Sequence, residues 1–420
     1  MIPCVLVAGT KSGVGKTTVV LGLLAALRRR GFEVAPFKVG PDFIDPTHHT
    51  AICERASRNL DTFMMGEEGV RRSFAKGVEG ADVAVIEGVM GLYDGLDATE
   101  VASSAAVAKA LGAPVLLVIN VHGTSRSAAA MALGYAKFDP EVEIAGLILN
   151  RVGSERHLTL LQEALKPLGI PILAALPRKS EISLKSRHLG LTMGFEGHHD
   201  LDALADFVEE NADLDWILKL GCNVPPSEPL PEFGGDRIKI GVAYDEAFCF
   251  YYQENFDELR RLGAEIEFFS PMCDPLPDVQ GLYLGGGYPE LYAEALERSQ
   301  TRSEIKKAAE NGMPIYGECG GLMYLCESVV SKDGDSENKM AGILPASTTM
   351  TGRLQALGYV EGDVVGENSV VERGRVIRGH EFHYSKMDCE KWSSRRLQLI
   401  SADHASPQSD ERPLRYLGQI

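Results

Sequence analysis

The stretch Gly9-Thr10-Lys11-Ser12-Gly13-Val14-Gly15-Lys16-Thr17-Thr18 follows an apolar run, Val5 to Ala8, and precedes a segment with the character of a helix, Val19 to Arg30. The order strand, glycine-rich loop and helix is typical of a phosphate-binding loop. Glycines allow backbone N–H groups to turn towards phosphate oxygens, and the helix N-terminus adds its positive end. The first half of the chain is therefore predicted to bind a nucleotide.

The side chains of this loop predict how the nucleotide is held. Lys16 is expected to reach the β- and γ-phosphates, and Thr17 is expected to be a Mg²⁺ ligand. The strict pattern would place glycine at position 10, where Thr10 stands. The additional Lys11 resembles the signature lysine of the deviant Walker A group, which includes the ParA-like ATPases and dethiobiotin synthetase. We expect ATP to contact six residues: Lys11, Gly13, Gly15, Lys16, Thr17 and Thr18.

Apolar runs alternate with helix-length segments along the first half of the chain. Such alternation predicts an α/β fold, a parallel sheet with helices on both faces like that of a P-loop NTPase. The runs are Val5 to Ala8, Val83 to Glu87, Val115 to Asn120, Ile144 to Asn150 and Ile170 to Ala174.

A proline-rich segment divides the chain. Four prolines fall within the nine residues 223–231, a density that neither a helix nor a central strand tolerates. Beyond it the α/β pattern restarts near Arg237. We predict a dethiobiotin-synthetase-like domain at 1–220, a linker at 221–236 and a second α/β domain at 237–420.

Composition excludes several classes of protein. A chain of 420 residues exceeds one ordinary core, so two domains are expected. No apolar run reaches the roughly 20 residues of a membrane helix, which excludes a transmembrane protein. The apolar start at residues 2–7 lacks the basic region of a signal peptide, which favours the cytoplasm. A net charge of −17 disfavours binding to nucleic acid. The eight cysteines form no C-x-x-C pair, which disfavours disulfides and structural zinc.

Two carboxylates lie where apolar runs end. Asp42 stands in the stretch 37–46, and Glu87 closes the run that begins at Val83. Ligands of open α/β sheets lie at such strand ends, and Mg²⁺ bound to a nucleotide takes one or two carboxylates. Each acid alone is more often a cap or turn residue, but together with the phosphate loop they predict a metal site.

Three motifs carry a family resemblance: 38–49 (KVGPDFIDPTHH), 58–61 (RNLD) and 87–95 (EGVMGLYDG). They resemble the cobyrinate a,c-diamide synthase and Ni-sirohydrochlorin a,c-diamide synthase family, and the resemblance extends from the phosphate loop to about Ser385. It implies ATP-dependent amidation of the a and c acetate side chains of a modified tetrapyrrole, with L-glutamine as nitrogen donor. It also implies that Thr17, Asp42 and Glu87 bind Mg²⁺.

A substrate with several carboxylates needs local cations. The predicted substrate residues lie beside the second strand: Lys38, Asp45, His48 and His49. The alternative is a capped loop with exposed histidines.

The second domain contains Tyr316-Gly317-Glu318-Cys319-Gly320-Gly321-Leu322 between an apolar run and a segment of helical character. Small residues permit a strained turn that exposes a thiol at a helix N-terminus, so Cys319 is predicted to be a nucleophile. A second glycine turn, 285–287, is suited to stabilising an oxyanion through Gly286 and Gly287. Both turns resemble those of class I glutamine amidotransferase domains.

The sequence departs from the family pattern at the histidine that is expected to act as the base for Cys319. The usual histidine lies in a C-terminal His-x-His context, whereas here the chain ends 35 residues after Ser385 without one. We expect a truncation or frameshift near the end; substitution by another histidine and weak glutaminase activity are the alternatives. His383 is preferred to His404 as a substitute, although a packed or capping role is the commoner one for such a residue.

The mechanism expected from these residues proceeds through an acyl phosphate, which ammonia released from glutamine attacks. The enzymatic alternative is cobyric acid synthase, whose elbow carries a different residue before the cysteine than Glu318. Two further hypotheses are a ParA-like ATPase switch and a degenerate binding protein. The sequence leaves open the choice of cobalt or nickel, and hence of cobalamin or coenzyme F430 biosynthesis. The order of the amidations and the oligomeric state, a homodimer included, are also open.

Overall fold

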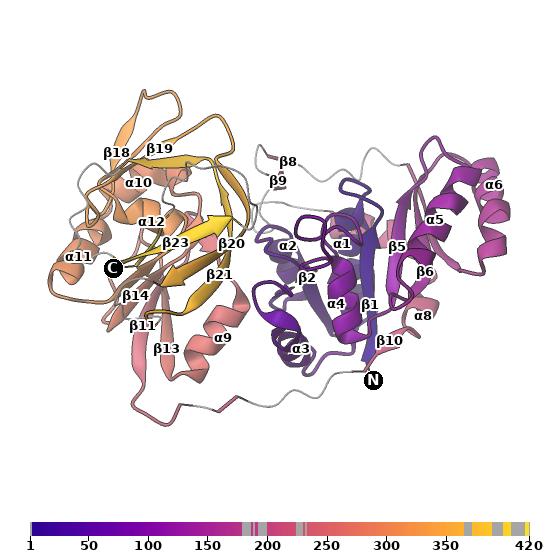
Figure 1. Ribbon diagram of the computed structural model, residues 1–420, viewed down its shortest axis with the longest axis horizontal. Helices are drawn as coiled ribbons and strands as arrows, with labels where there is room; N and C mark the ends of the chain where they lie inside the picture. Colours follow the sequence, from indigo (N-terminus) through magenta and orange to yellow (C-terminus); the bar gives the residue numbers. More distant parts are fainter. Residues whose placement is uncertain are drawn as a thin grey trace. The chain divides into compact units, whose positions relative to one another are not determined.

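The computed structural model describes residues 2–178, 200–223, 230–231, 233–364 and 372–388, and the backbone of four short strands at 186–187, 190–191, 398–404 and 416–419. The chain divides into two compact units, Met1–Pro229 and Leu230–Ile420 (Figure 1). This division falls inside the predicted linker, and the predicted boundaries themselves stay a prediction.

The first unit is built on a sheet with the strand order β3-β2-β4-β1-β5-β6-β7. All neighbours in this order are parallel. The strands are β1 (Ile2–Gly9), β2 (Val34–Val39), β3 (Arg58–Leu60), β4 (Val83–Glu87), β5 (Val115–Asn120), β6 (Ile144–Val152) and β7 (Ile172–Pro177). A short strand, β10 (Gly221–Cys222), pairs antiparallel with the start of β1, and β8 (Ser186–Arg187) pairs with β9 (Gly190–Leu191).

Helices cover both faces of this sheet. The side chains of β1 alternate between two cores, Leu6 in one and Val7 in the other. The core of Leu6 contains buried residues of α3 (Gly66–Gly77), α4 (Ser104–Leu111), α5 (Arg126–Phe138) and α6 (Glu155–Leu165), which continues into the 3₁₀ helix Lys166–Leu168. The core of Val7 contains residues of α1 (Lys16–Arg29), α2 (Asp45–Cys53), α7 (Leu201–Glu209) and α8 (Leu214–Ile217).

The second unit has a mixed sheet with the order β13-β11-β14-β16-β24-β23-β20-β21. Its parallel half contains β11 (Ile238–Ala243), β13 (Ala264–Phe269), β14 (Gly281–Leu284) and β16 (Ile315–Gly317). Its antiparallel half contains β20 (Ala356–Val364), β21 (Val376–His383), β23 (Gln398–His404) and β24 (Tyr416–Gln419).

Shorter elements complete this unit. The helices are α9 (Gln253–Arg261), the 3₁₀ helix η2 (Pro289–Tyr292), α10 (Ala293–Arg298), α11 (Gln300–Glu310) and α12 (Gly320–Leu325). A smaller sheet contains β17 (Ser328–Val330), β18 (Glu337–Lys339), β19 (Ser347–Met350) and β22 (Ser385–Asp388), and β12 (Phe248–Phe250) pairs with β15 (Gly286–Gly287).

The predicted fold class is confirmed in both halves, because each unit contains parallel strands joined through helices. The glycine-rich loop joins β1 to α1, as expected from the sequence. Within the described residues, no helix combines the length and the apolar character that crossing a bilayer requires.

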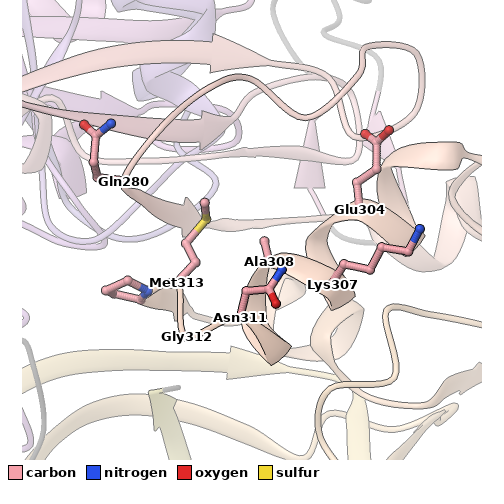
Figure 2. Close-up of a pocket in the computed structure, with 8 residues that line it drawn as sticks. Gln280, Glu304, Lys307, Ala308, Asn311, Gly312 and Met313 are labelled. Carbon is pink, nitrogen blue, oxygen red and sulfur yellow. The ribbon is translucent and has the colours of Figure 1, made fainter.

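A shallow hollow of about 590 Å³ lies beside the C-terminal end of α11, between Gln280 and Pro314 (Figure 2). These two residues immediately precede β14 and β16, which run parallel. The hollow is therefore at the amino ends of the strands, whereas ligands of open parallel sheets bind beyond their carboxyl ends.

Candidate active sites

The phosphate loop requires glycine at two positions. Gly13 and Gly15 have φ angles of 76° and 96°, in the left-handed region that favours glycine. A Cβ atom at Gly15 would also lie 2.2 Å from Nδ2 of Asn150, which donates a hydrogen bond to the carbonyl of Val14 over 2.8 Å. Asn150, on β6, thus fixes the loop from a neighbouring strand.

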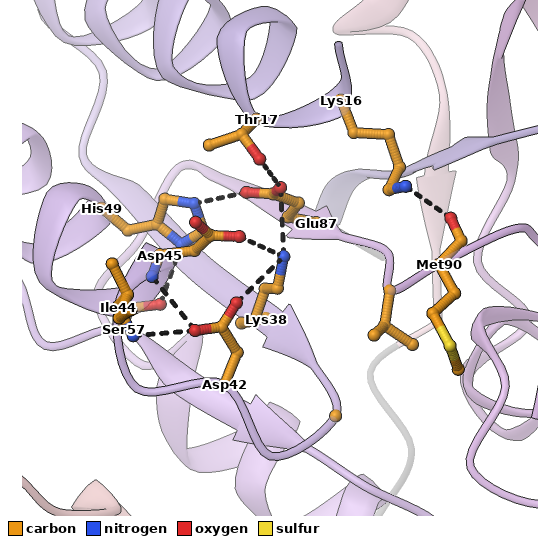
Figure 3. Close-up of polar contacts among 12 residues, drawn as sticks. Lys16, Thr17, Lys38, Asp42, Ile44, Asp45, His49, Ser57, Glu87 and Met90 are labelled. Carbon is orange, nitrogen blue, oxygen red and sulfur yellow. Dashed lines mark hydrogen bonds and ion pairs between the residues drawn. The ribbon is translucent and has the colours of Figure 1, made fainter. Parts of the chain in front are cut away.

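The ammonium group of Lys16 lies between the phosphate loop and the segment after β4. Its side chain is buried, and Nζ donates to the carbonyl of Met90 and, over 3.5 Å, to that of Lys11 (Figure 3). Burial lowers the pKa of Lys16, and the positive charge of Lys38 lowers it further. Lys11 contributes only its carbonyl to these contacts, and its own side chain is exposed.

Three carboxylates surround the ammonium group of Lys38. Nζ lies 2.5 Å from Asp45, 3.1 Å from Glu87 and 3.7 Å from Asp42 (Figure 3). Burial opposes the charge on Lys38, but the carboxylates of Asp45 and Glu87 outweigh this effect and raise the pKa of Lys38. We call these four residues the Lys38 cluster.

Glu87 joins this cluster to the phosphate loop. Thr17 donates to its Oε1 over 2.7 Å, and Nε2 of His49 lies 2.8 Å from its Oε2. The other ring nitrogen of His49 lies 3.2 Å from the Ser57 hydroxyl. Burial would raise the pKa of Glu87, but Lys38 and the bond to His49 outweigh it and lower the pKa well below its usual range. Glu87 is therefore ionised at neutral pH.

The oxygen atoms of this site fit Mg²⁺. Carboxylate and hydroxyl oxygens are its preferred ligands, and it normally completes its shell with water and substrate phosphates. Among the described residues, no group of three or more His, Cys, Asp or Glu side chains is arranged to hold a metal ion unaided. The Lys38 ammonium group lies among the predicted ligands as a stand-in cation, which shows that these oxygens form a cation-binding environment.

The predicted substrate residues lie beneath the surface. The relative exposures are 4% for Lys38, 8% for Asp45, 1% for His48 and 0% for His49. His49 contacts Glu87, so in this structure it orients a predicted metal ligand. Contact of these four side chains with a substrate stays a prediction and requires the Lys38 cluster to open.

Two contacts of the loop were not predicted from the sequence. One is the hydrogen bond from Asn150, whose only sequence signal is a polar residue closing an apolar strand. The other is from the hydroxyl of Tyr135, on α5, which donates to the carbonyl of Thr10 over 2.5 Å. Because the acceptor is a backbone carbonyl, Tyr135 holds the main chain of the loop at residue 10.

Cys319 occupies a strained turn between β16 and α12. Its φ and ψ angles are 51° and −114°, a left-handed value of φ for a residue that carries a side chain. Its neighbour Gly321 could not carry a side chain, because a Cβ atom there would lie 2.0 Å from the carbonyl oxygen of Leu284. The turn therefore has the geometry of a nucleophile elbow, and it leaves Cys319 exposed.

The glycine turn after β14 lies against this thiol. A Cβ atom at Gly286 would lie 3.3 Å from Cβ of Cys319. Gly287 has a φ angle of 153°, and a Cβ atom there would meet the carbonyl oxygen of Ala247 at 2.1 Å. The backbone N–H groups of Gly320 and Gly287 act on the sulfur by lowering the pKa of the Cys319 thiol. They are therefore placed to donate to an oxyanion beside it.

The environment of the thiol does not by itself generate a thiolate. Although Cys319 is exposed at the turn, the protein around its sulfur displaces enough water to raise the pKa of the thiol to about 11, and the charges of Glu318 and Glu290 contribute in the same direction. The bonds from Gly320 and Gly287 oppose this effect but do not reverse it. A thiolate at neutral pH needs a proton acceptor or a bound ligand.

His383 lies at the end of β21 and is half-buried. Its Nδ1 is 2.9 Å from the carbonyl oxygen of Ser385, which can only accept a hydrogen bond. Nδ1 therefore carries the proton in the neutral ring, and Nε2 has the free lone pair that a base requires. The side chain of His404 lies outside the described residues.

A parallel P-loop unit joined to a unit with a thiol elbow defines a nucleotide-dependent amidotransferase. Comparison with known families agrees with this class. Residues 5–191 match the CobQ/CobB/MinD/ParA nucleotide binding domain, and residues 239–410 match the CobB/CobQ-like glutamine amidotransferase domain.

The chain belongs to the cobyrinate a,c-diamide synthase family. It is 46% identical over 398 residues to the cobyrinate a,c-diamide synthase of Archaeoglobus fulgidus, covering 92% of this chain and 86% of the relative. The Syntrophotalea carbinolica enzyme is 48% identical over 400 residues, covering 92% and 87%. The predicted family and the predicted class of enzyme, a ligase with glutamine as amide-nitrogen donor, are confirmed.

Among solved structures, the chain is similar to the cobyrinic acid a,c-diamide synthase of Mycobacterium smegmatis with bound ADP and magnesium. The identity is 18% and the TM-score 0.28, covering 43% of this chain and 89% of the other.

Proposed function

We propose that the protein converts the a and c acetate carboxylates of cobyrinate to amides, using ATP, Mg²⁺ and glutamine. The observation that supports this proposal most directly is the presence of two separate reaction centres in one chain. Lys16 lies at the phosphate loop, where Thr17 bonds to Glu87, and Cys319 lies against Gly286 in the second unit. The relatives at 46% and 48% identity are cobyrinate a,c-diamide synthases, which is the reason for choosing cobyrinate.

The first centre has to activate a carboxylate, whose oxygen is a poor leaving group. Transfer of the γ-phosphoryl group of ATP to that carboxylate gives an acyl phosphate, from which phosphate leaves when ammonia attacks. In this proposal, Lys16 and the N–H groups of the phosphate loop stabilise charge on the transferring group. Thr17, Asp42 and Glu87 would hold Mg²⁺, which would neutralise phosphate charge.

The Lys38 cluster has a defined part in this proposal. The Lys38 ammonium group balances the negative charge of Asp42, Asp45 and Glu87. A Mg²⁺ ion held by Thr17, Asp42 and Glu87 would supply part of this positive charge, and Lys38, beside Asp45, would then be available to an anionic group of the substrate. His49 keeps Glu87 in one orientation, because its ring is fully buried and bonded on both nitrogens.

The second centre has to release ammonia from glutamine. The thiolate of Cys319 attacks the side-chain amide carbon, and the carbonyl oxygen becomes an oxyanion that the N–H groups of Gly287 and Gly320 stabilise. Collapse expels ammonia and leaves a thioester, which water hydrolyses to glutamate. The thiol proton needs an acceptor, and Nε2 of His383 is the proposed one.

The test is incubation with ATP, Mg²⁺ and glutamine against cobyrinate and, separately, against Ni-sirohydrochlorin, followed by mass analysis. We expect two successive losses of one mass unit each on cobyrinate, since replacing OH by NH₂ lowers the mass by about one. Amidation of Ni-sirohydrochlorin alone would move the protein to the nickel branch that leads to coenzyme F430. Absence of amidation on both, with the protein folded, would contradict the proposal.

A further inference from the structure

Glu318, the residue before the proposed nucleophile, has a side chain that the mechanism above does not use. Its Oε1 accepts a hydrogen bond from the hydroxyl of Tyr283 at 2.5 Å, and its Oε2 accepts one from the hydroxyl of Tyr316 at 3.0 Å. Burial raises the pKa of Glu318, and the two phenols oppose this. Glu318 is half-buried, and each of its two carboxylate oxygens is bound by a phenol from a different strand.

The two phenols belong to the two strands that carry the halves of the thiol site. Tyr283 is on β14 and Tyr316 is on β16, directly opposite each other in the parallel pairing. Gly287 comes three residues after the end of β14, and Cys319 comes two residues after the end of β16. The Glu318 carboxylate therefore ties the strand that leads to the oxyanion donor to the strand that leads to the thiol.

The orientation of these phenols is itself fixed. Asn255, on α9, donates its amide N–H to the Tyr283 oxygen over 3.2 Å, which leaves the hydroxyl hydrogen for Glu318. The rings of Tyr283 and Tyr316 meet edge to face with centroids 5.2 Å apart. Tyr251 packs against Tyr283 and accepts a hydrogen bond from the N–H of Gly285 over 2.8 Å, so the glycine turn is bound to the same group.

Backbone hydrogen bonds also connect the turn after β14 to the turn after β16. The N–H of Glu318 donates to the carbonyl of Leu284 over 3.0 Å, and the N–H of Gly321 donates to that of Gly285 over 2.8 Å. These bonds set the register of the two turns. The Glu318 carboxylate, bound by a phenol from each strand, adds a side-chain connection between the same two strands.

We propose that Glu318, with Tyr283 and Tyr316, is a positioning clamp that sets the distance between the Cys319 thiol and the Gly287 N–H. The inference rests on the proposed role of Cys319 in using glutamine. Catalysis by an oxyanion donor depends on its distance from the oxyanion and not from the ground-state carbonyl. A loosened clamp therefore lowers the turnover with glutamine more than it lowers the binding of glutamine.

The chemistry of the clamp explains why the residue is an acid. A carboxylate has two acceptor oxygens and no donor, so it can satisfy both phenols at once. A glutamine has a single acceptor oxygen, so only one phenol could still donate to it. The other phenol would have to accept from the NH₂ group, and its own hydroxyl hydrogen would lose the oxygen to which it donates here. The clamp thus predicts an effect of Glu318→Gln although the two side chains have nearly the same shape.

The experiment compares Tyr283→Phe, Tyr316→Phe and Glu318→Gln with two controls. Tyr324→Phe removes the hydroxyl of a buried tyrosine of α12 that has no hydrogen-bond partner among the described residues. Glu294→Gln removes an exposed carboxylate of α10, whose contact is an ion pair with Arg298. Each protein is assayed for glutamate release from glutamine, for amidation with ammonium salt, and for thermal unfolding.

We expect each clamp variant to lower kcat for glutamate release by about tenfold, a fraction of the roughly 10²- to 10³-fold lost with a whole oxyanion donor. KM for glutamine and the rate with ammonium should stay within about twofold of wild type, and both controls should match wild type. In the double variant Tyr283→Phe/Tyr316→Phe, the fold-reduction in kcat for glutamate release should be clearly smaller than the product of the two single reductions, because the residues act as a unit.

A wild-type kcat with glutamine in all three clamp variants would overturn the proposal. So would an equal loss with glutamine and ammonium that follows a loss of thermal stability, since that is the pattern of a merely structural role. Cys319→Ser separates the two levels of inference. If this variant still uses glutamine, the proposed role of Cys319 is wrong; if it does not and the clamp variants are silent, the clamp alone is wrong.

Discussion

The hydroxyl of Thr17 donates a hydrogen bond to Oε1 of Glu87 over 2.7 Å. Thr17 stands in the first turn of α1 and Glu87 is the last residue of β4, so this bond connects the phosphate loop to the neighbouring strand end. Lys38 contacts the same oxygen at 3.1 Å. Oε1 of Glu87 therefore contacts both the phosphate loop, through Thr17, and the ammonium group of Lys38.

Lys16→Ala is expected to abolish amidation with glutamine and with ammonium alike. The acyl phosphate has to form before either source of ammonia can react, and Lys16 is the buried ammonium group at the loop. The measurement is product formation with each nitrogen source, with Lys137→Ala, a change of an exposed lysine in the last turn of α5, as the comparison. Amidation by Lys16→Ala near the wild-type rate would end the ATP proposal.

Glu87→Gln should increase the Mg²⁺ concentration needed for half-maximal turnover. The substitution retains the shape but removes the charge of a proposed ligand. His49→Gln should have a smaller effect of the same kind, roughly 10-fold, because loss of an outer partner typically costs 10- to 100-fold in metal affinity. Glu67→Gln is the control, since Glu67 is exposed and pairs with Arg71 on α3.

An unchanged Mg²⁺ dependence in Glu87→Gln would place the metal elsewhere. Thermal unfolding of the same variants shows whether the protein is folded. Lys38 retains Asp45 and Asp42 as partners in this variant, so we expect it to fold.

The local patterns in the sequence predicted the parts of these sites that follow one another along the chain. The strand, loop and helix around Lys16 and the turn around Cys319 are each set by a few adjacent residues, glycines above all, and both were predicted. The N-terminal β1 has an antiparallel neighbour at Gly221–Cys222 that was not predicted. A strand of only two residues is too short to show a periodic sequence pattern, and its pairing with β1 depends on the packing of the whole unit.

The contacts of the His49 and Glu318 side chains also could not be predicted from local sequence patterns. His49 was predicted as a substrate cation, but which face of α2 is buried depends on the sheet beneath it, and the structure places its ring against Glu87. One partner of Glu318, Tyr316, is only two residues away in sequence. Tyr283 is on another strand, and only the register of β14 against β16 brings it there.

Cys319→Ser should eliminate the use of glutamine and leave amidation with concentrated ammonium nearly intact. The serine hydroxyl cannot replace the thiolate as a nucleophile, whereas the phosphate-loop unit does not depend on it. Parallel assays with the two nitrogen sources provide the measurement. Equal failure with both sources would mean that Cys319 has a structural role or that ammonia delivery depends on it.

Alkylation of Cys319 by iodoacetamide without glutamine should accelerate steadily as the pH rises from 7 to 10. The thiolate is the reactive form, and desolvation raises the pKa of Cys319 to about 11. The neutral thiol therefore predominates throughout this range, and the thiolate fraction grows about tenfold per pH unit. Modification is measured by peptide mass analysis with Cys319→Ser as background. A plateau near pH 8 would contradict this prediction and indicate a base already coupled to the thiol.

The last prediction concerns that base. A general base typically contributes about 10²- to 10⁴-fold, so loss of the acting histidine should slow glutamate release by that factor and leave the ammonium rate unchanged. We expect the largest effect from His383→Ala, because Nδ1 is held by the carbonyl of Ser385 and Nε2 has the free lone pair. His380, whose ring meets Tyr359 edge to face on the same strand pair, is the matched comparison.

If His383→Ala uses glutamine as efficiently as it uses ammonium, the base lies elsewhere, and His404→Ala is the next variant to assay. If none of the three changes matters and wild type releases glutamate far more slowly than it uses ammonium, Cys319 works without a histidine base.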